Sequence, residues 1–131
     1  MVRRMVVLGS VLAVATAAAA SAATSGVYTG TTSQGLAISL KVNSGKVVNV
    51  NYIAKYGSCG EFTGNKGKVA LAITNNKFSG TAHLNSETVI KLAGSFFLGN
   101  SVKGTLSATL TTGGIHPMTC KTGTLTFTAK H

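Results

Sequence analysis

The chain has 131 residues, enough for one domain, and it carries a formal net charge of +10 at pH 7. It contains no aspartate and only two acidic residues, Glu61 and Glu87. This composition excludes a Ser-His-Asp triad and leaves a single pair of carboxylates for chemistry such as glycoside hydrolysis. Both glutamates fall in segments that we predict as loop or turn, and nothing in the sequence brings them together. We therefore expect no enzymatic activity.

The first 22 residues read as a secretory signal peptide. Arg3 and Arg4 precede a run of apolar and small residues from 6 to 20, and Ala-Ser-Ala at 20–22 offers a cleavage site. The run is shorter than the roughly 20 residues that span a bilayer, although an uncleaved helical anchor is the alternative. We expect a mature chain of residues 23–131 that is secreted, free outside the cell or associated with its wall, with no later transmembrane segment.

The rest of the chain alternates apolar and polar residues with a period of two, which indicates half-buried strands. Glycine, asparagine and serine separate the runs, and Asn75-Asn76 is typical of a two-residue hairpin turn. We predict loops over 57–67 and 111–119. The predicted strands cover residues 27–31, 36–42, 46–56, 69–74, 77–84, 88–98, 102–110 and 121–130.

No helical period follows the signal peptide. Short strands at regular spacing with glycine-containing turns are typical of antiparallel sandwiches and up-and-down barrels. The sequence therefore predicts an all-β fold: a single antiparallel domain of about eight strands, arranged as a meander-type barrel or a sandwich and preceded by a signal-peptide helix.

The only cysteines are Cys59 and Cys120. In an exported chain an even count predicts a disulfide, with two free thiols or an intermolecular pair as the alternatives. Together with Glu61 and His116 they could be imagined as a metal site, but a disulfide would leave no strong ligand set. No phosphate or dinucleotide loop occurs, and we expect no metal or cofactor.

After the signal peptide there are ten lysines, two glutamates and no arginine. A charge near +8 favours an anionic partner, whereas the alternative is that lysine keeps a β-protein soluble and guards its edges. Export and the lack of arginine argue against nucleic acid. Basic groups beside aromatic rings can bind anionic sugars, and one stretch combines them; we predict a binding patch of Tyr52, Lys55, Tyr56, Phe62, Lys66 and Lys68.

The same patch residues are also compatible with a plain strand end and its loop. The alternating threonines between 122 and 128 have two readings as well. Threonine favours strands for packing reasons, and this explains the pattern without any function. The alternative is a flat array of hydroxyl groups that binds a ligand.

The opening Tyr28-Thr29-Gly30-Thr31-Thr32-Ser33-Gln34-Gly35, with Ser44-Gly45-Lys46-Val47 further on, carries a resemblance. It is similar to small secreted actinobacterial proteins of uncharacterised function, which have a cysteine after the third strand and another in the final strand. The resemblance covers nearly the whole mature chain. It implies a compact β-domain with one disulfide, and it implies no activity, cofactor or catalytic residue.

Two functions fit these observations. The first is a non-catalytic domain that binds an anionic cell-envelope polymer or glycan surface, because a strongly basic chain is exported. The second is a protein-interaction module, an inhibitor or assembly subunit that binds an extracellular protein through a sheet edge or one of the two predicted loops. The sequence does not specify the oligomeric state.

Overall fold

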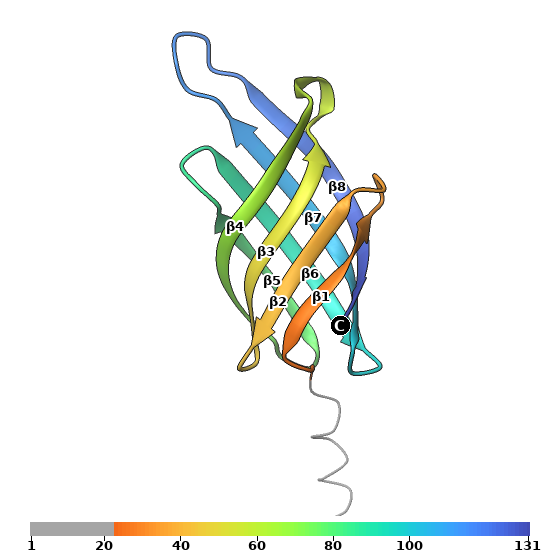
Figure 1. Cartoon of the computed structure of the whole chain (residues 1–131). Helices are drawn as coiled ribbons and strands as arrows, with labels where there is room; N and C mark the ends of the chain where they lie inside the picture. Colours follow the sequence, from red (N-terminus) through yellow and green to blue (C-terminus); the bar gives the residue numbers. More distant parts are fainter. Residues whose placement is uncertain (1–22) are drawn as a thin grey trace, which may run out of the picture.

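The computed structural model describes residues 23–131, except for the side chains of residues 65–67; the predicted signal peptide lies outside this range. The all-β prediction is confirmed, because eight strands form one antiparallel sheet (Figure 1). A 3-10 turn, η1 (Gly57–Cys59), follows the third strand. The strands are β1 (Gly26–Thr32), β2 (Ala37–Asn43), β3 (Lys46–Lys55), β4 (Glu61–Ala72), β5 (Lys77–His83), β6 (Thr88–Phe97), β7 (Ser101–Thr111) and β8 (Thr119–Lys130).

The sheet order is β4-β3-β2-β1-β8-β7-β6-β5. It consists of two four-stranded meanders, β1–β4 and β5–β8, which join where β1 pairs with β8. The sheet curls into a half-barrel, so its two edge strands, β4 and β5, come to face each other (Figure 1). A single curled sheet resolves the choice between barrel and sandwich in favour of the barrel-like arrangement.

The core fills the inside of the curl with one side chain in two from every strand. The largest side chains among those that are fully buried are three tyrosines, Tyr28, Tyr52 and Tyr56, followed by aliphatic residues. Burying a Val, Leu, Ile or Phe side chain contributes roughly 1.5–3 kcal/mol, so this shared interior holds the curl together.

Two glycines stand where a neighbouring strand comes too close for any side chain. A methyl group placed on Gly30 would lie 1.8 Å from the carbonyl oxygen of Thr128, and one on Gly104 would lie 2.0 Å from that of Ala93. Real side chains do not come so close to a neighbouring strand, so only glycine permits the curl at these points. Phe78 and Phe127 lie over Gly94 and Gly104 respectively and cover the spaces that these glycines leave.

The predicted turn at Asn75-Asn76 is confirmed by its backbone angles, and Ser44-Gly45 forms a turn of the same kind. Asn75 and Asn76 have φ of 54° and 62°, and Ser44 and Gly45 have φ of 52° and 76°. Two successive residues with positive φ are the mark of the tight turn whose twist matches that of a hairpin. The Ser44-Gly45 turn connects the paired strands β2 and β3, whereas the Asn75-Asn76 turn leads from one edge strand, β4, to the other, β5.

The predicted loop over residues 57–67 is wrong in its second half. η1 and Gly60 form a short connection, and β4 begins at Glu61 and pairs along the whole of β3. Two of the four glycines that suggested a loop, Gly64 and Gly67, lie within the strand. Gly64 makes room for the ring of Tyr52, because a methyl group there would lie 2.4 Å from two of its ring atoms.

The predicted intramolecular disulfide is confirmed. Cys59 in η1 is bonded to Cys120 in β8, with the two Cα atoms 6.1 Å apart. In the sheet, β2 and β1 lie between β3 and β8. We call the end of the curl at which β3 ends and β8 begins the mouth. The disulfide crosses this mouth and connects the two meanders a second time, independently of the β1–β8 pairing.

Candidate functional site

Five residues of the predicted patch lie in β3 and β4 and Tyr56 lies directly after β3, and two of the six belong to the core. Tyr52 and Tyr56 are each 2% exposed, and their hydroxyl groups are hydrogen-bonded to each other at 2.6 Å. Burial raises the pKa of both phenols, and for Tyr52 the hydrogen bond to Tyr56 raises it further. Neither tyrosine offers a face to a ligand outside the domain.

The other patch residues are spread along the sheet. Phe62 is 43% exposed, and its ring packs edge to face against Tyr56 at the mouth of the curl. Lys55 pairs with Glu61, whereas Lys68 pairs with Asn49 six residues earlier in β3, roughly 20 Å away along the strand. The side chain of Lys66 lies outside the described residues. Lys55 and Phe62 lie at the same end of the β3–β4 pair but on opposite faces, because Phe62 pairs with the buried Ala54, and both are far from Lys68.

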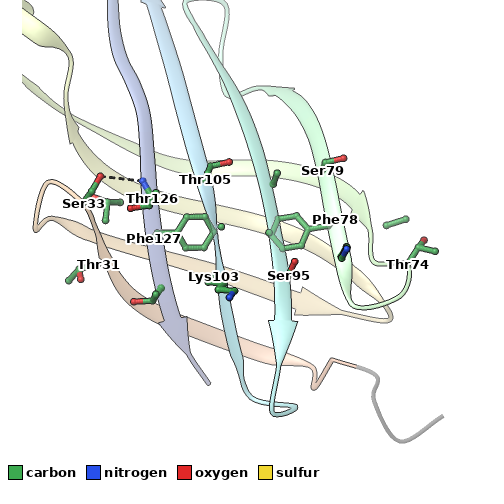
Figure 2. A pocket seen from close by; sticks show the side chains of 17 residues that line it. Thr31, Ser33, Thr74, Phe78, Ser79, Ser95, Lys103, Thr105, Thr126 and Phe127 are labelled. Carbon is green, nitrogen blue, oxygen red and sulfur yellow. Dashed lines mark hydrogen bonds between the residues drawn. The ribbon is translucent and has the colours of Figure 1, made fainter. Parts of the chain in front are cut away.

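A more continuous candidate site lies on the outer face of β5–β8. A shallow hollow of about 960 Å³ lies there, with a smaller one beside it that shares Ser79, Ala93 and Thr105 (Figure 2). The centre of the hollow is lined by residues with small side chains or none, namely Ala93, Gly94 and Gly104. Longer side chains form its rim. The polar side chains that line the main hollow are Thr31, Thr32, Ser33, Thr74, Lys77, Ser79, Ser95, Lys103, Thr105, Thr126 and Thr128.

Strand register places these side chains in rows that run across the sheet. One row reads Lys77, Ser95, Lys103, Thr128 and Thr31 from β5 to β1. The next reads Ser79, Ala93, Thr105 and Thr126, and the third reads Thr81, Lys91, Ser107 and Thr124. Neighbouring strands are about 4.8 Å apart, so the first and third rows present a polar group about every 5 Å, and Ala93 interrupts the second. We call these three rows the hydroxyl–lysine face.

The hydroxyl–lysine face carries positive charge only. It contains Lys77, Lys91 and Lys103, and β5, β6, β7 and β8 contain no acidic residue. Hydroxyl groups can donate to or accept from a ligand oxygen, and ammonium groups pair with carboxylate, sulfate or phosphate. This combination suits an extended anionic ligand with many hydroxyl groups.

The groups that a catalytic or metal site would need lie elsewhere. Glu61 begins β4 and Glu87 lies in the β5–β6 turn, and both are exposed, as are His83, His116 and His131. Among residues 23–131 there is no cluster of three or more histidine, cysteine or acidic side chains that could hold a metal ion. Over the same residues, no helix is long and apolar enough to cross a bilayer.

Comparison with protein-family models, with curated proteins and with solved structures gave no significant match. The support for the candidate site is therefore its geometry alone.

Sequence reasoning gave little weight to the hydroxyl–lysine face, although one signal was present. The alternating threonines of β8 face outward, as an amphipathic strand requires. What the sequence did not show is that β5, β6 and β7 place serine, threonine and lysine beside them. That alignment depends on the strand order and register, which a single chain does not reveal.

Proposed function

We propose that this domain is exported and, without catalysing a reaction, binds an anionic polymer of the cell envelope or an anionic glycan through the hydroxyl–lysine face. The observation that carries the proposal is the row in which Lys77 and Lys103 alternate with the hydroxyls of Ser95 and Thr128 on strands free of acidic residues. A flat, open surface fits a polymer chain better than it fits a small molecule, which needs a deeper pocket.

Export supports the same proposal. A disulfide between Cys59 and Cys120 suits an oxidising compartment outside the cytoplasm, where envelope polymers are found. The lysines on this face would meet the carboxylate, sulfate or phosphate groups of such a polymer, and the rows of hydroxyls would bind its sugar hydroxyls. Because the lysines are exposed, binding should weaken as salt is added.

The test compares two double variants of residues 23–131 that have the same net charge. Lys77→Ala/Lys103→Ala removes two lysines from the hollow, and Lys41→Ala/Lys46→Ala removes two exposed lysines from β2 and β3. Binding to polygalacturonate, heparin and neutral dextran is measured by titration calorimetry at low and high salt. At about 1 kcal/mol per lysine, the first variant should bind the anionic polymers about thirtyfold more weakly.

The control variant should bind the anionic polymers within a few-fold of the unmodified domain, and dextran should not bind to any of them. Equal losses in both double variants would show that net charge alone attracts the polymer and that the hydroxyl–lysine face is not the site. Absence of binding to either anionic polymer at low salt would reject the proposed function.

A further inference from the structure

The half-barrel has a seam where its two edge strands face each other without forming a ladder. β4 pairs with β3 and β5 pairs with β6. Between β4 and β5, within residues 23–131, the one bridge is Thr74 with Lys77, next to the turn that connects them. Leu71 of β4 packs its side chain over Gly80 of β5, which covers the core there without backbone pairing.

The two edges of the seam differ in how well they are protected. β4 has register shifts against β3 at two places, and its edge carries the exposed Lys68. Bulges and lysines are common ways in which proteins prevent an edge strand from pairing with another chain. β5 pairs with β6 over seven residues without a shift, contains no proline, and has its single lysine at its first position. β5 is therefore the edge that can accept another strand.

The bridge next to the turn tells which backbone groups of β5 point into the seam. The N–H of Lys77 donates to the carbonyl of Thr74, and the N–H of Thr74 donates to the carbonyl of Lys77. Backbone groups alternate sides along a strand, so those of Ser79, Thr81 and His83 also point into the seam. The side chains of these three residues are exposed on the outer face.

Charge indicates the chemistry of the added strand. Its outward side chains would lie beside Lys77 and near Lys91 on the next strand, with Lys68 across the seam and no acidic residue on β5 or β6. Opposite charges on neighbouring strands stabilise a sheet, and like charges destabilise it. A second copy of this chain would bring its own lysines to the seam, so a different chain fits better.

We propose that the β5 edge accepts an extended strand from a partner protein, whose outward-facing side chains are acidic and whose inward-facing side chains are apolar. The partner is held by backbone hydrogen bonds to Ser79, Thr81 and His83, and its acidic side chains pair with the lysines. This mode of binding is strand addition. It differs from polymer binding in using the backbone at the edge, although both modes engage Lys77 and Lys91.

The test uses residues 23–131 and a capped peptide of alternating glutamate and valine, long enough to span β5. Thr81→Pro removes a backbone donor that points into the seam, and edge strands tolerate proline at such positions. Thr81→Ala is the matched control, because it removes the same side chain and keeps the donor. Peptide affinity is measured by fluorescence anisotropy, and amide hydrogen exchange is followed in the unmodified domain.

The proposal predicts that the peptide protects the amides of Ser79, Thr81 and His83 from exchange and that a lysine–valine peptide does not bind. It further predicts at least tenfold weaker binding to Thr81→Pro and unchanged binding to Thr81→Ala. The exchange measurement decides the matter even if Thr81→Pro fails to fold. Binding without protection of these three amides would mean attraction to the lysines alone and would overturn the proposal. Concentration-dependent dimerisation that protects the same amides would do so too, because the occupant would be a second copy.

Discussion

The two meanders of this sheet are built from the same kind of strand but differ in regularity. In the first, β1–β4, the three buried tyrosines lie inside, and the register shifts once between β2 and β3 and twice between β3 and β4. In the second, β5–β8, glycines lie beside phenylalanine rings, and β5–β6 and β6–β7 pair without a shift. The first meander is irregular and encloses polar groups and bulky rings. The second is more regular and presents a shallow outer surface and the unpaired edge of β5.

This difference indicates which part of a small sheet can carry a binding surface. A buried tyrosine needs a partner for its hydroxyl group, and the strand around it must adapt its geometry. Phenylalanine makes no such demand, so β5, β6 and β7 keep an even ladder, and β7–β8 shifts only once, between Ser107 and Thr109. Substitutions in each meander, and in the disulfide that connects them, can test this difference.

The largest effect is expected from removing the disulfide, because it ties the end of β3 to β8 across the mouth. Cysteines 61 residues apart close a long loop, and Cys59→Ser/Cys120→Ser should lower the free energy of unfolding by about 4 kcal/mol on the chain-entropy model. Urea denaturation followed by tyrosine fluorescence measures the change. An unaltered midpoint would mean that the β1–β8 ladder alone joins the meanders.

The second effect concerns the bend in the regular meander. A methyl group at Gly104 would meet the carbonyl oxygen of Ala93 at 2.0 Å and a ring atom of Phe127 at 2.9 Å. Gly104→Ala should therefore cost about 3 kcal/mol, the upper end of the range for overpacking. Gly113→Ala is the control, since nothing lies within 4 Å of that position, and it should change the unfolding free energy by less than about 0.5 kcal/mol.

If the two alanine variants unfold at the same urea concentration, the sheet bends somewhere other than Gly104. A larger loss for Gly104→Ala would show that the flat outer face depends on a tight inner bend.

The sequence predicted the period-two strands, the paired turn at Asn75 and Asn76, and the disulfide, because each is a local pattern or an elimination between two residues. It missed the start of β4, since Gly64 resembled a loop residue until the ring of Tyr52 was placed over it. Which strands become neighbours depends on contacts distant in the chain. For that reason the sequence predicted neither the hydroxyl–lysine face nor the seam, and it placed the buried Tyr52 and Tyr56 in a surface patch.

The shared hydroxyl pair of Tyr52 and Tyr56 gives the third prediction, in the irregular meander. Tyr56→Phe leaves the Tyr52 hydroxyl buried without its 2.6 Å partner and should cost about 2 kcal/mol. Tyr52→Phe/Tyr56→Phe removes both polar groups and should be close to the unmodified domain in stability. A double variant that is as unstable as the single one would show that the rings, and not the hydroxyls, matter.

The same pair makes stability depend on alkaline pH. Burial raises the pKa of Tyr52 and Tyr56 above the ordinary value of 10.0. Groups whose pKa is higher in the folded state contribute stability that is complete below pH 10 and is lost as pH rises above it. Urea midpoints should therefore fall between pH 9 and 12. They should fall less steeply in the double phenylalanine variant, in which Tyr28 is the one remaining tyrosine whose pKa is raised by burial. Parallel slopes would contradict this origin.

The smallest effect concerns Gln34, in the turn that stands between the two meanders. Its side-chain amide donates to the carbonyl of Lys55 at 3.0 Å and accepts from the N–H of Lys55 at 2.8 Å, so it acts as one more residue of a strand paired with the end of β3. Its neighbour Ser33 donates its backbone N–H to the carbonyl of Thr126 in β8 and accepts from the N–H of Thr126 with its side-chain hydroxyl. The turn thus holds both meanders at the mouth.

Gln34→Ala should lower the free energy of unfolding by about 1 kcal/mol and speed hydrogen exchange at the amide of Lys55. Lys55→Ala keeps the backbone groups to which Gln34 bonds, and should change stability by less than about 0.5 kcal/mol. If the two variants behave alike, the amide contributes nothing and the turn is held by Ser33 and the disulfide. If they differ as expected, Gln34 in the opening Thr-Ser-Gln turn has a structural role, because the glutamine does for β3 what Ser33 does for β8.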